Sequence, residues 1–255
     1  MEEYPPFSVT AGDPEVDKSV QKPVDPSSMS FVYSWMFSVI ASPIETNIST
    51  DEANQAQLQL QQSQTNPTDI FSIFNHNLIL PPCKKTLILD LDETLVHSTL
   101  APVNHHHLTV NVVVEDVECT FYVIKRPHVD YFIEKVAEWY NVVVFTASMK
   151  EYADPLLNKL DPNRLMKKRY FRESCLEKEG NYVKDLSLIQ QDLATTIIVD
   201  NSPIAYSNNI ENALPIDNWM GDNPSDQSLL TLLPFLEVLR YVNDVRSILS
   251  LRFSQ

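Results

Sequence analysis

The stretch Thr86-Leu-Ile-Leu-Asp90-Leu-Asp92-Glu-Thr94 decides the fold, because an apolar run leads there directly into two carboxylates and a hydroxyl. Two later runs are built in the same way: Val142–Thr146 ends in a threonine and Ile197–Asp200 ends in an aspartate. Runs this apolar, without polar alternation, are typical of strands buried on both faces, which occur in parallel sheets covered by helices. The sequence therefore predicts an α/β fold with a parallel sheet at its centre.

The polar residues at the ends of these runs predict a shared site. Ligands of open parallel sheets bind at the carboxyl ends of the strands, and all three runs deliver their polar residue there. The intervals from Asp90 to Thr146 and from Thr146 to Asp200 are long enough for the helical crossovers that parallel strands require. We therefore expect Asp90, Thr146 and Asp200 to line one crevice.

The acidic turn from Asp90 to Thr94 is open to two chemical interpretations. A calcium loop would need glycine at its sixth position and a bidentate glutamate at its twelfth, but those positions hold Leu95 and Ala101. A phosphoryl-transfer site needs one carboxylate to attack phosphorus, a second to handle the proton of the leaving group, and a hard cation to neutralise charge. Asp90 and Asp92 supply both carboxylates, so the second interpretation is favoured.

The composition of the 255 residues narrows the function classes. Hydrophobic content of 44% is enough for one core, and only three glycines argue against a glycine-rich nucleotide loop. A formal net charge of -15 argues against nucleic acid as a partner, since that binding depends on lysine and arginine. Three widely separated cysteines fit a reducing compartment, and the acidic residues after Met1 do not form a secretory signal, so the chain is expected to begin in the cytosol.

The chain is predicted to divide into a tail, residues 1–77, and a folded domain, residues 78–255. Residues 1–80 carry ten acidic and two basic residues together with a glutamine-rich stretch, so most of the tail is expected to be disordered. Within it, residues 31–44 are apolar and uncharged. A helix over that segment reaches roughly 21 Å, short of the ~30 Å hydrocarbon core, so it is interpreted either as a membrane contact or as a partner-binding segment.

Two stretches with alternating polarity predict a small β-hairpin flap over the site. Leu108–Val114 and Cys119–Ile124 are expected to pair as antiparallel strands, with residues 115–117 between them. The three histidines at 105–107 precede the flap. Because adjacent residues on a loop point in different directions, they are assigned to a solvated loop rather than to a metal site.

Helices are expected around the sheet wherever apolar residues recur at helical spacing. One helix is predicted to begin at Val129 and another to end before Asp161. Late helices are predicted over 226–242 and 244–251, the former with a kink or a break at Pro234. These helices would cover the sheet and complete a Rossmann-like layer arrangement.

The run Asp90-Leu-Asp-Glu-Thr-Leu-Val-His97 resembles the motif of haloacid-dehalogenase-like phosphatases, specifically the group that acts on the C-terminal domain of RNA polymerase and related phosphoproteins. Further family elements follow in order as Phe145-Thr-Ala-Ser148, Phe171-Arg-Glu-Ser-Cys175, Lys184-Asp-Leu186 and Asp200-Asn-Ser-Pro203. The resemblance covers roughly residues 78–252. It implies a magnesium-dependent phosphoserine/phosphothreonine protein phosphatase that forms an aspartyl-phosphate intermediate.

The resemblance assigns the catalytic and metal-binding roles residue by residue. Asp90 would be the nucleophile, and Asp92 would protonate the leaving group and then activate water. Magnesium would be held by the Asp90 carboxylate, the Asp92 backbone carbonyl and the Asn201 side chain. Asp200 would stand behind these groups and orient Lys184 or a water on the metal.

Four residues are implied to bind the substrate. Thr146 would hydrogen-bond the phosphoryl oxygens, Lys184 would offset their charge, and Arg172 would lie at the substrate entrance. Thr94 completes the set and is expected to orient Asp92. The small flap would leave the groove open to a phosphoprotein, whereas a small-molecule phosphatase of the same fold usually has a larger cap. A non-catalytic phosphoprotein-binding module is the other alternative, and the intact acidic residues argue against it.

Two branches of the group are both represented in the sequence. Four stretches resemble Dullard-type nuclear-envelope phosphatases, which act on lipin-like phosphoproteins and carry an N-terminal hydrophobic anchor: residues 125–130, 139–140, 145–149 and 244–247. Residues 152–154 and 171–173 resemble the small polymerase-tail phosphatases. The first branch implies a nuclear-envelope or endoplasmic-reticulum membrane location facing the cytosol or nucleus, with a membrane-bound regulatory subunit. The second implies a soluble nuclear or cytoplasmic enzyme.

Overall fold

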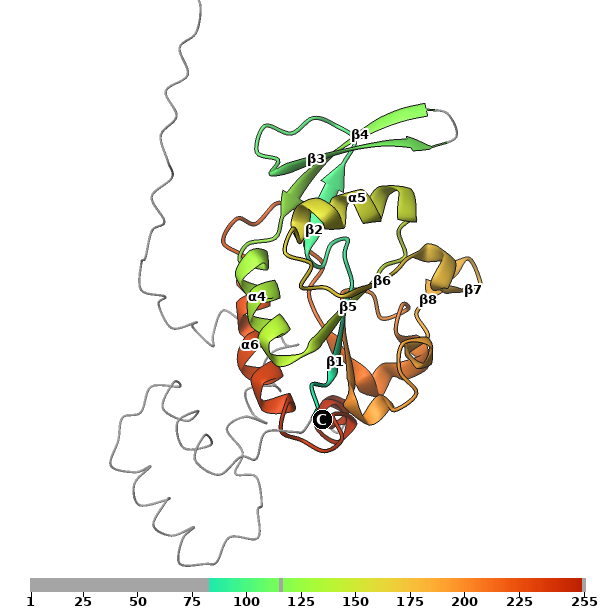
Figure 1. Cartoon of the computed structure of the whole chain (residues 1–255), viewed down its shortest axis with the longest axis vertical. Helices are drawn as coiled ribbons and strands as arrows, with labels where there is room; N and C mark the ends of the chain where they lie inside the picture. Colours follow the sequence, from blue (N-terminus) through green and yellow to red (C-terminus); the bar gives the residue numbers. More distant parts are fainter. Residues whose placement is uncertain (1–82, 115–116, 254–255) are drawn as a thin grey trace, which may run out of the picture.

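The computed structural model describes residues 83–114 and 117–253, which form a central sheet with a flap at one end (Figure 1). The sheet has five strands in the order β10-β9-β1-β5-β6, and every neighbouring pair is parallel. Their bounds are β1 Thr86–Leu89, β5 Asn141–Phe145, β6 Lys168–Tyr170, β9 Thr196–Asp200 and β10 Ala213–Pro215. The three apolar runs of the sequence are the three central strands, so the predicted α/β fold is confirmed.

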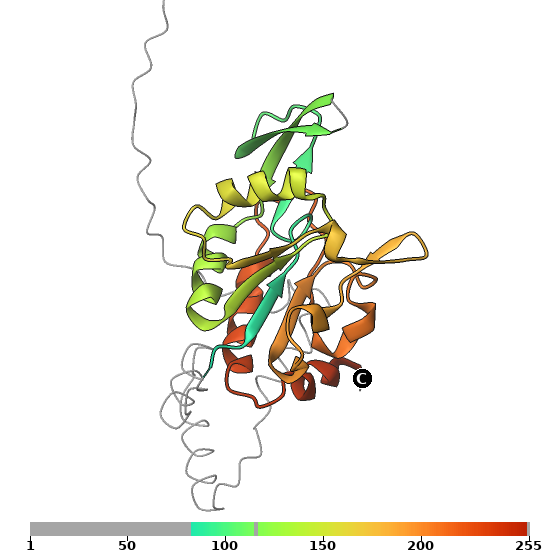
Figure 2. The ribbon, with the colours of Figure 1, turned by 45° about the vertical axis from the view of Figure 1, so that its right-hand side comes forward.

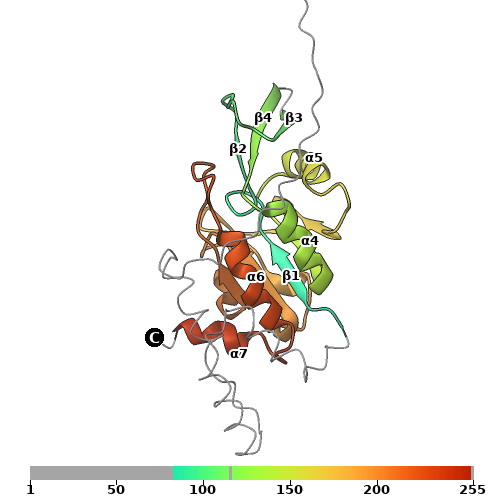
Figure 3. The same cartoon turned by 90° about the vertical axis from the view of Figure 1, so that its left-hand side faces the viewer.

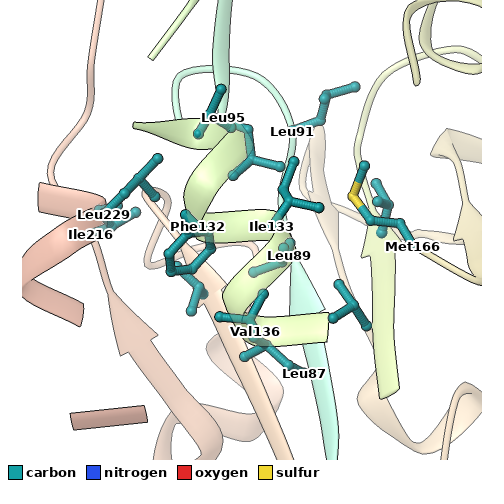
Figure 4. Close-up of a cluster of buried hydrophobic side chains, with 14 of the residues drawn as sticks. Leu87, Leu89, Leu91, Leu95, Phe132, Ile133, Val136, Met166, Ile216 and Leu229 are labelled. Carbon is teal, nitrogen blue, oxygen red and sulfur yellow. The ribbon is translucent and has the colours of Figure 1, made fainter. Parts of the chain in front are cut away.

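One face of the sheet is covered by long helices (Figure 3). Helices α4 (Val129–Trp139) and α6 (Ser228–Leu239) lie side by side there, and α5 (Lys150–Leu160) and α7 (Arg246–Leu249) extend the same apolar layer. Leu87 and Leu89 of β1 point into this layer, where Phe132 and Val136 of α4 meet them (Figure 4). Each of these four side chains is fully buried, so the α4 face of the sheet forms the main core.

The opposite face is covered by short segments instead of long helices. Ile88 and Ile198 point to that side and pack with Leu186 and Tyr206. Short 3₁₀ turns supply most of this cover, at Arg172–Ser174, Leu186–Leu188, Leu193–Thr195 and Ser207–Asn212, and another follows α7 at Ser250–Phe253. Because successive strand residues point to opposite faces, the unbroken apolar runs are explained by burial on both sides.

The flap has three strands rather than the predicted two (Figure 2). β3 (Leu108–Val114) and β4 (Val117–Lys125) pair as predicted, although β4 begins at Val117, which was expected in the connection. The third strand, β2 (Val96–Thr99), follows the acidic turn and pairs with β4. A second, smaller hairpin, β7 (Leu176–Lys178) with β8 (Asn181–Val183), projects beside the sheet. The sequence missed β2 because four residues are too few for an alternation pattern.

The helix predictions agree with the structure except at Pro234. The helix beginning at Val129 and the helix before Asp161 are present, and the two late helices are shorter than expected. α6 runs through Pro234 without ending, so the prediction of a break is wrong, and the alternative, a kink at Pro234, stays a prediction. The predicted tail, the apolar segment 31–44 and the domain boundary at residue 78 lie outside the described residues. Among the helices of residues 83–114 and 117–253, none is both long and apolar enough to cross a membrane.

Candidate active site

The candidate site lies where the three central strands end. Asp90 directly follows β1, Thr146 directly follows β5, and Asp200 is the last residue of β9. The strands are in register, since Leu89 pairs with Val144 on one side and with Val199 on the other. The carboxyl edge of the sheet therefore carries all three residues.

A buried lysine joins two of the carboxylates. Lys184 Nζ lies 2.5 Å from Asp90 Oδ1 and 2.6 Å from Asp200 Oδ2, and its side chain is 1% exposed. Burial alone would lower the pKa of Lys184, but the Asp90 and Asp200 carboxylates outweigh that effect and raise it. Burial and the neighbouring charge of Asp90 raise the pKa of Asp200. Lys184 is thus held as a cation against the candidate nucleophile, and Asp200 orients it.

Asp92 is held by two hydroxyl groups. Ser148 Oγ donates to Asp92 Oδ2 and Tyr152 Oη donates to Asp92 Oδ1, each at 2.7 Å. Burial raises the pKa of Asp92 to about 6, while these two hydrogen bonds act in the opposite direction. Ser148 lies in the loop after β5 and Tyr152 in the first turns of α5. Neither was among the predicted site residues, because a serine and a tyrosine carry no site signal without this tertiary contact.

Thr94 contacts a different partner from the one predicted. Its hydroxyl is fully buried and donates to Asn201 Oδ1 at 3.2 Å, so its hydrogen bond runs to Asn201 and not to the carboxylate of Asp92. Asn201 Nδ2 in turn donates to Asn218 Oδ1 at 2.8 Å. The acidic turn and the loop after β9 are therefore linked through Asn201.

Thr146 and Arg172 are linked through the loop after β5, because the Arg172 amide donates to the Ser148 carbonyl at 3.0 Å. Thr146 is 1% exposed, and its hydroxyl oxygen accepts a hydrogen bond from the Ser148 amide at 3.0 Å. Arg172 Nε donates to the Ala147 carbonyl at 2.6 Å, and its guanidinium lies 4.9 Å from the centre of the Tyr182 ring. No described residue accepts from the two terminal nitrogens of Arg172, so they are available to a ligand.

The oxygen donors around Asp90 suit a hard cation. Asp90 is buried, and Lys184 donates to its Oδ1. No described residue donates to the other carboxylate oxygen, Oδ2. Within residues 83–114 and 117–253, no three His, Cys, Asp or Glu side chains gather as a metal cluster. The ligands that the family resemblance predicts, the Asp90 carboxylate, the Asp92 backbone carbonyl and the Asn201 amide, are all oxygen donors, a chemistry that suits Mg²⁺ because that ion usually keeps several waters. Histidines 105–107 lie on an exposed loop, as predicted.

Several known proteins are similar to this chain. CTD nuclear envelope phosphatase 1B of Danio rerio is 44% identical over 76% of this chain and 83% of that protein. CTD nuclear envelope phosphatase 1 homolog of Drosophila melanogaster is 45% identical over 77% of this chain and 84% of that protein. CTD small phosphatase-like protein 1 of Caenorhabditis elegans is 46% identical over 67% of this chain and 36% of that protein.

The solved structure of Fcp1, an essential RNA polymerase II CTD phosphatase, aligns with a TM-score of 0.48 and 17% identity, over 67% of this chain and 53% of that chain. The family model described as NLI interacting factor-like phosphatase matches residues 85–246, which include every candidate site residue and the whole sheet. By this match, and by its identity to the nuclear envelope phosphatases, the chain belongs to the NLI interacting factor-like phosphatase family.

Proposed function

We propose that this protein phosphatase hydrolyses phosphoserine and phosphothreonine in proteins, with magnesium, through an aspartyl-phosphate on Asp90. The observation that carries the proposal is the pairing of two differently held carboxylates at the end of β1. Asp90 lies against the Lys184 cation, whereas Asp92 lies between two hydroxyl groups. Paired acids in unlike surroundings divide the roles of nucleophile and proton donor.

The first half of the reaction transfers the phosphoryl group to the enzyme. A carboxylate oxygen of Asp90 attacks phosphorus, and the bond from phosphorus to the serine or threonine oxygen breaks. Asp92 donates its proton to that leaving oxygen, so the product leaves as a neutral alcohol. Lys184 offsets the negative charge of the phosphoryl oxygens, and Thr146 donates a hydrogen bond to one of them. Magnesium held by Asp90, Asp92 and Asn201 would neutralise further charge at the reacting phosphate.

The second half of the reaction releases phosphate. Water attacks the phosphorus of the aspartyl-phosphate, and Asp92, now ionised, accepts the proton of that water. The bond between phosphorus and the Asp90 oxygen breaks, which restores both carboxyl groups to their starting states. The contact of Lys184 with Asp200 would keep this cation beside Asp90 in both halves of the reaction.

Asn201 provides the test of the metal proposal. We expect Asn201→Ala to raise the magnesium concentration for half-maximal activity at least about tenfold, since it removes a ligand whose orientation is fixed by Thr94. Magnesium added to the EDTA-treated full chain should raise the Tm of the wild type, and the variant should need correspondingly more. Asn158→Ala, at an exposed contact with Arg169, is the matched control. If Asn201→Ala needs no more magnesium than the wild type, either for activity or for the rise in Tm, Asn201 is not a magnesium ligand.

The free guanidinium nitrogens of Arg172 support a peptide substrate. We expect a phosphoserine peptide to be hydrolysed with higher kcat/KM than free phosphoserine, which would also exclude the small-molecule alternative. Arg172→Ala should raise KM for the peptide about tenfold and lower kcat less, because Arg172 contacts the substrate rather than the reacting atoms. Steady-state kinetics on both substrates decide this. Equal kcat/KM for peptide and free phosphoserine would contradict an extended groove.

The physiological substrate and the location are proposed from the relatives' names. Two relatives are called nuclear envelope phosphatases and one is called a small phosphatase-like protein. We propose a phosphoprotein substrate of the lipin-like or the polymerase-tail kind, and a location at the nuclear envelope. Membrane contact through residues 31–44 and a membrane-bound regulatory subunit stay predictions, since that segment lies outside the described residues.

A further inference from the structure

The hydroxyl of Tyr152 connects the second carboxylate of the site to the flap. Tyr152 Oη lies 2.7 Å from Asp92 Oδ1 and 2.5 Å from Ser98 Oγ, and Tyr152 is 6% exposed. Ser98 belongs to β2, a flap strand. The Tyr152 ring also packs against Phe121 of β4, with ring centroids 4.7 Å apart. Both contacts fix the position of this hydroxyl from the flap side.

The other oxygen of Asp92 is fixed from the sheet side. Ser148 Oγ donates to Asp92 Oδ2, and the Ser148 amide donates to the Thr146 hydroxyl oxygen. Thr146 directly follows β5 and is the proposed phosphate contact. The loop that presents Thr146 to the phosphate therefore also presents a hydroxyl to Asp92, so that the two groups keep a constant relative position.

We propose that Tyr152 and Ser148 are positioning residues for proton transfer at Asp92, and that Ser98 extends this support to the flap. The inference rests on the proposed role of Asp92 as the proton donor. A carboxyl group on a turn can rotate about its side-chain bonds, and a proton donor must lie within hydrogen-bond reach of the leaving oxygen. One donor on each oxygen holds the carboxyl plane, whereas a single donor would let it turn.

Substrates with different leaving groups distinguish a loss of Asp92 orientation from general structural damage to the protein. A leaving oxygen of high basicity, such as a serine alkoxide, needs the proton from Asp92 when the bond to phosphorus breaks. A nitrophenolate is stable as an anion and leaves without that proton. Loss of correct Asp92 orientation should therefore slow only the substrates with basic leaving groups, while misfolding would slow all of them equally.

The experiment uses the full chain and measures kcat/KM on a phosphoserine peptide and on a series of substituted aryl phosphates. Tyr152→Phe keeps the ring against Phe121 and removes only the hydroxyl. We expect about a tenfold loss on the peptide, less than about a twofold loss on p-nitrophenyl phosphate, and a steeper dependence on leaving-group basicity between them. Ser148→Ala should behave in the same way, and Ser98→Ala should show a smaller effect of the same kind.

Two further variants make each outcome decisive. Tyr140→Phe removes another buried tyrosine hydroxyl, one that donates to the Leu236 carbonyl far from the site, and it should leave the leaving-group dependence unchanged. Asp92→Asn sets the upper limit of the effect. If Asp92→Asn shows the wild-type dependence, the proposed role of Asp92 fails. If Asp92→Asn steepens it but Tyr152→Phe and Ser148→Ala do not, the positioning inference is overturned and the proposed function stands.

Discussion

Replacing Asp90 by asparagine is expected to reduce kcat by about 10⁴ or more, because the variant lacks the ionised oxygen that attacks phosphorus. The side chain keeps its size, and Lys184 keeps its contact with Asp200, so the domain should remain folded. Acid-quenched mass spectrometry should detect a covalent phosphoryl adduct in the wild type during turnover and none in the variant. Beryllium fluoride should inhibit the wild type by mimicking the aspartyl-phosphate.

A second buried aspartate provides the control for this prediction. Asp161 is 3% exposed, and its carboxylate accepts hydrogen bonds from the amides of Leu165 and Met166 at the end of α5. Asp161→Asn should lower Tm because it weakens these charged contacts, but it should leave kcat within about twofold of wild type. Phosphate release by Asp90→Asn at a wild-type rate, or a phosphoryl adduct on another residue, would contradict the proposed aspartyl-phosphate on Asp90.

The sequence predicted the parts of the site that lie at the carboxyl ends of strands. Asp90, Thr146 and Asp200 could be placed together because parallel strands end at one edge, whatever the details of packing. Lys184 and Arg172 were different, because each lies in a loop whose course no local pattern predicts. Their inclusion came from resemblance to the phosphatase family, and the structure brings Lys184 between two carboxylates.

The contacts that the sequence could not predict all join segments far apart in the chain. Ser148 and Tyr152 meet Asp92 across fifty-six and sixty positions, and Thr94 meets Asn201 across one hundred and seven. Hydroxyl and amide side chains form such contacts only after the sheet has placed their backbones, so residue type and spacing carry no signal for them. Thr94 is an example: Asp92 is nearer in sequence, but the hydrogen-bond partner of the Thr94 hydroxyl is Asn201.

Arg126 links the acidic turn to the C-terminal part of the chain. Its side chain is fully buried and makes a bidentate pair with Asp226, from Nε at 2.8 Å and from the second terminal nitrogen at 3.1 Å. The remaining terminal nitrogen donates to the carbonyls of Thr94 and Asp217, at 3.2 and 3.0 Å. One guanidinium thus satisfies a partly buried carboxylate and two backbone carbonyls, one of them in the turn that carries Asp92.

Arg126→Met is therefore expected to cost about 2–3 kcal/mol of unfolding free energy, because a partly buried carboxylate and two carbonyls lose their donor. The neighbouring Lys125→Met is the matched control. Lys125 pairs with Asp130, which is 61% exposed, and loss of an exposed pair costs at most about 1 kcal/mol. Urea unfolding of both variants measures the difference. Similar losses for the two variants would show that the Arg126 contacts contribute no more than a surface pair.

The pH dependence of stability provides an independent check on the ion pair between Arg126 and Asp226. Burial would raise the pKa of Asp226, but hydrogen bonds and charge from Arg126 outweigh it and hold the pKa below its usual value. A carboxyl group with a depressed pKa in the folded state contributes stability above its unfolded pKa of about 3.9 and loses it as the pH falls through the folded value. The stability difference between wild type and Asp226→Asn should therefore be constant from about pH 6 to 8 and shrink below about pH 4. A difference that persists undiminished in acid would mean that Asp226 acts through packing and not through its charge.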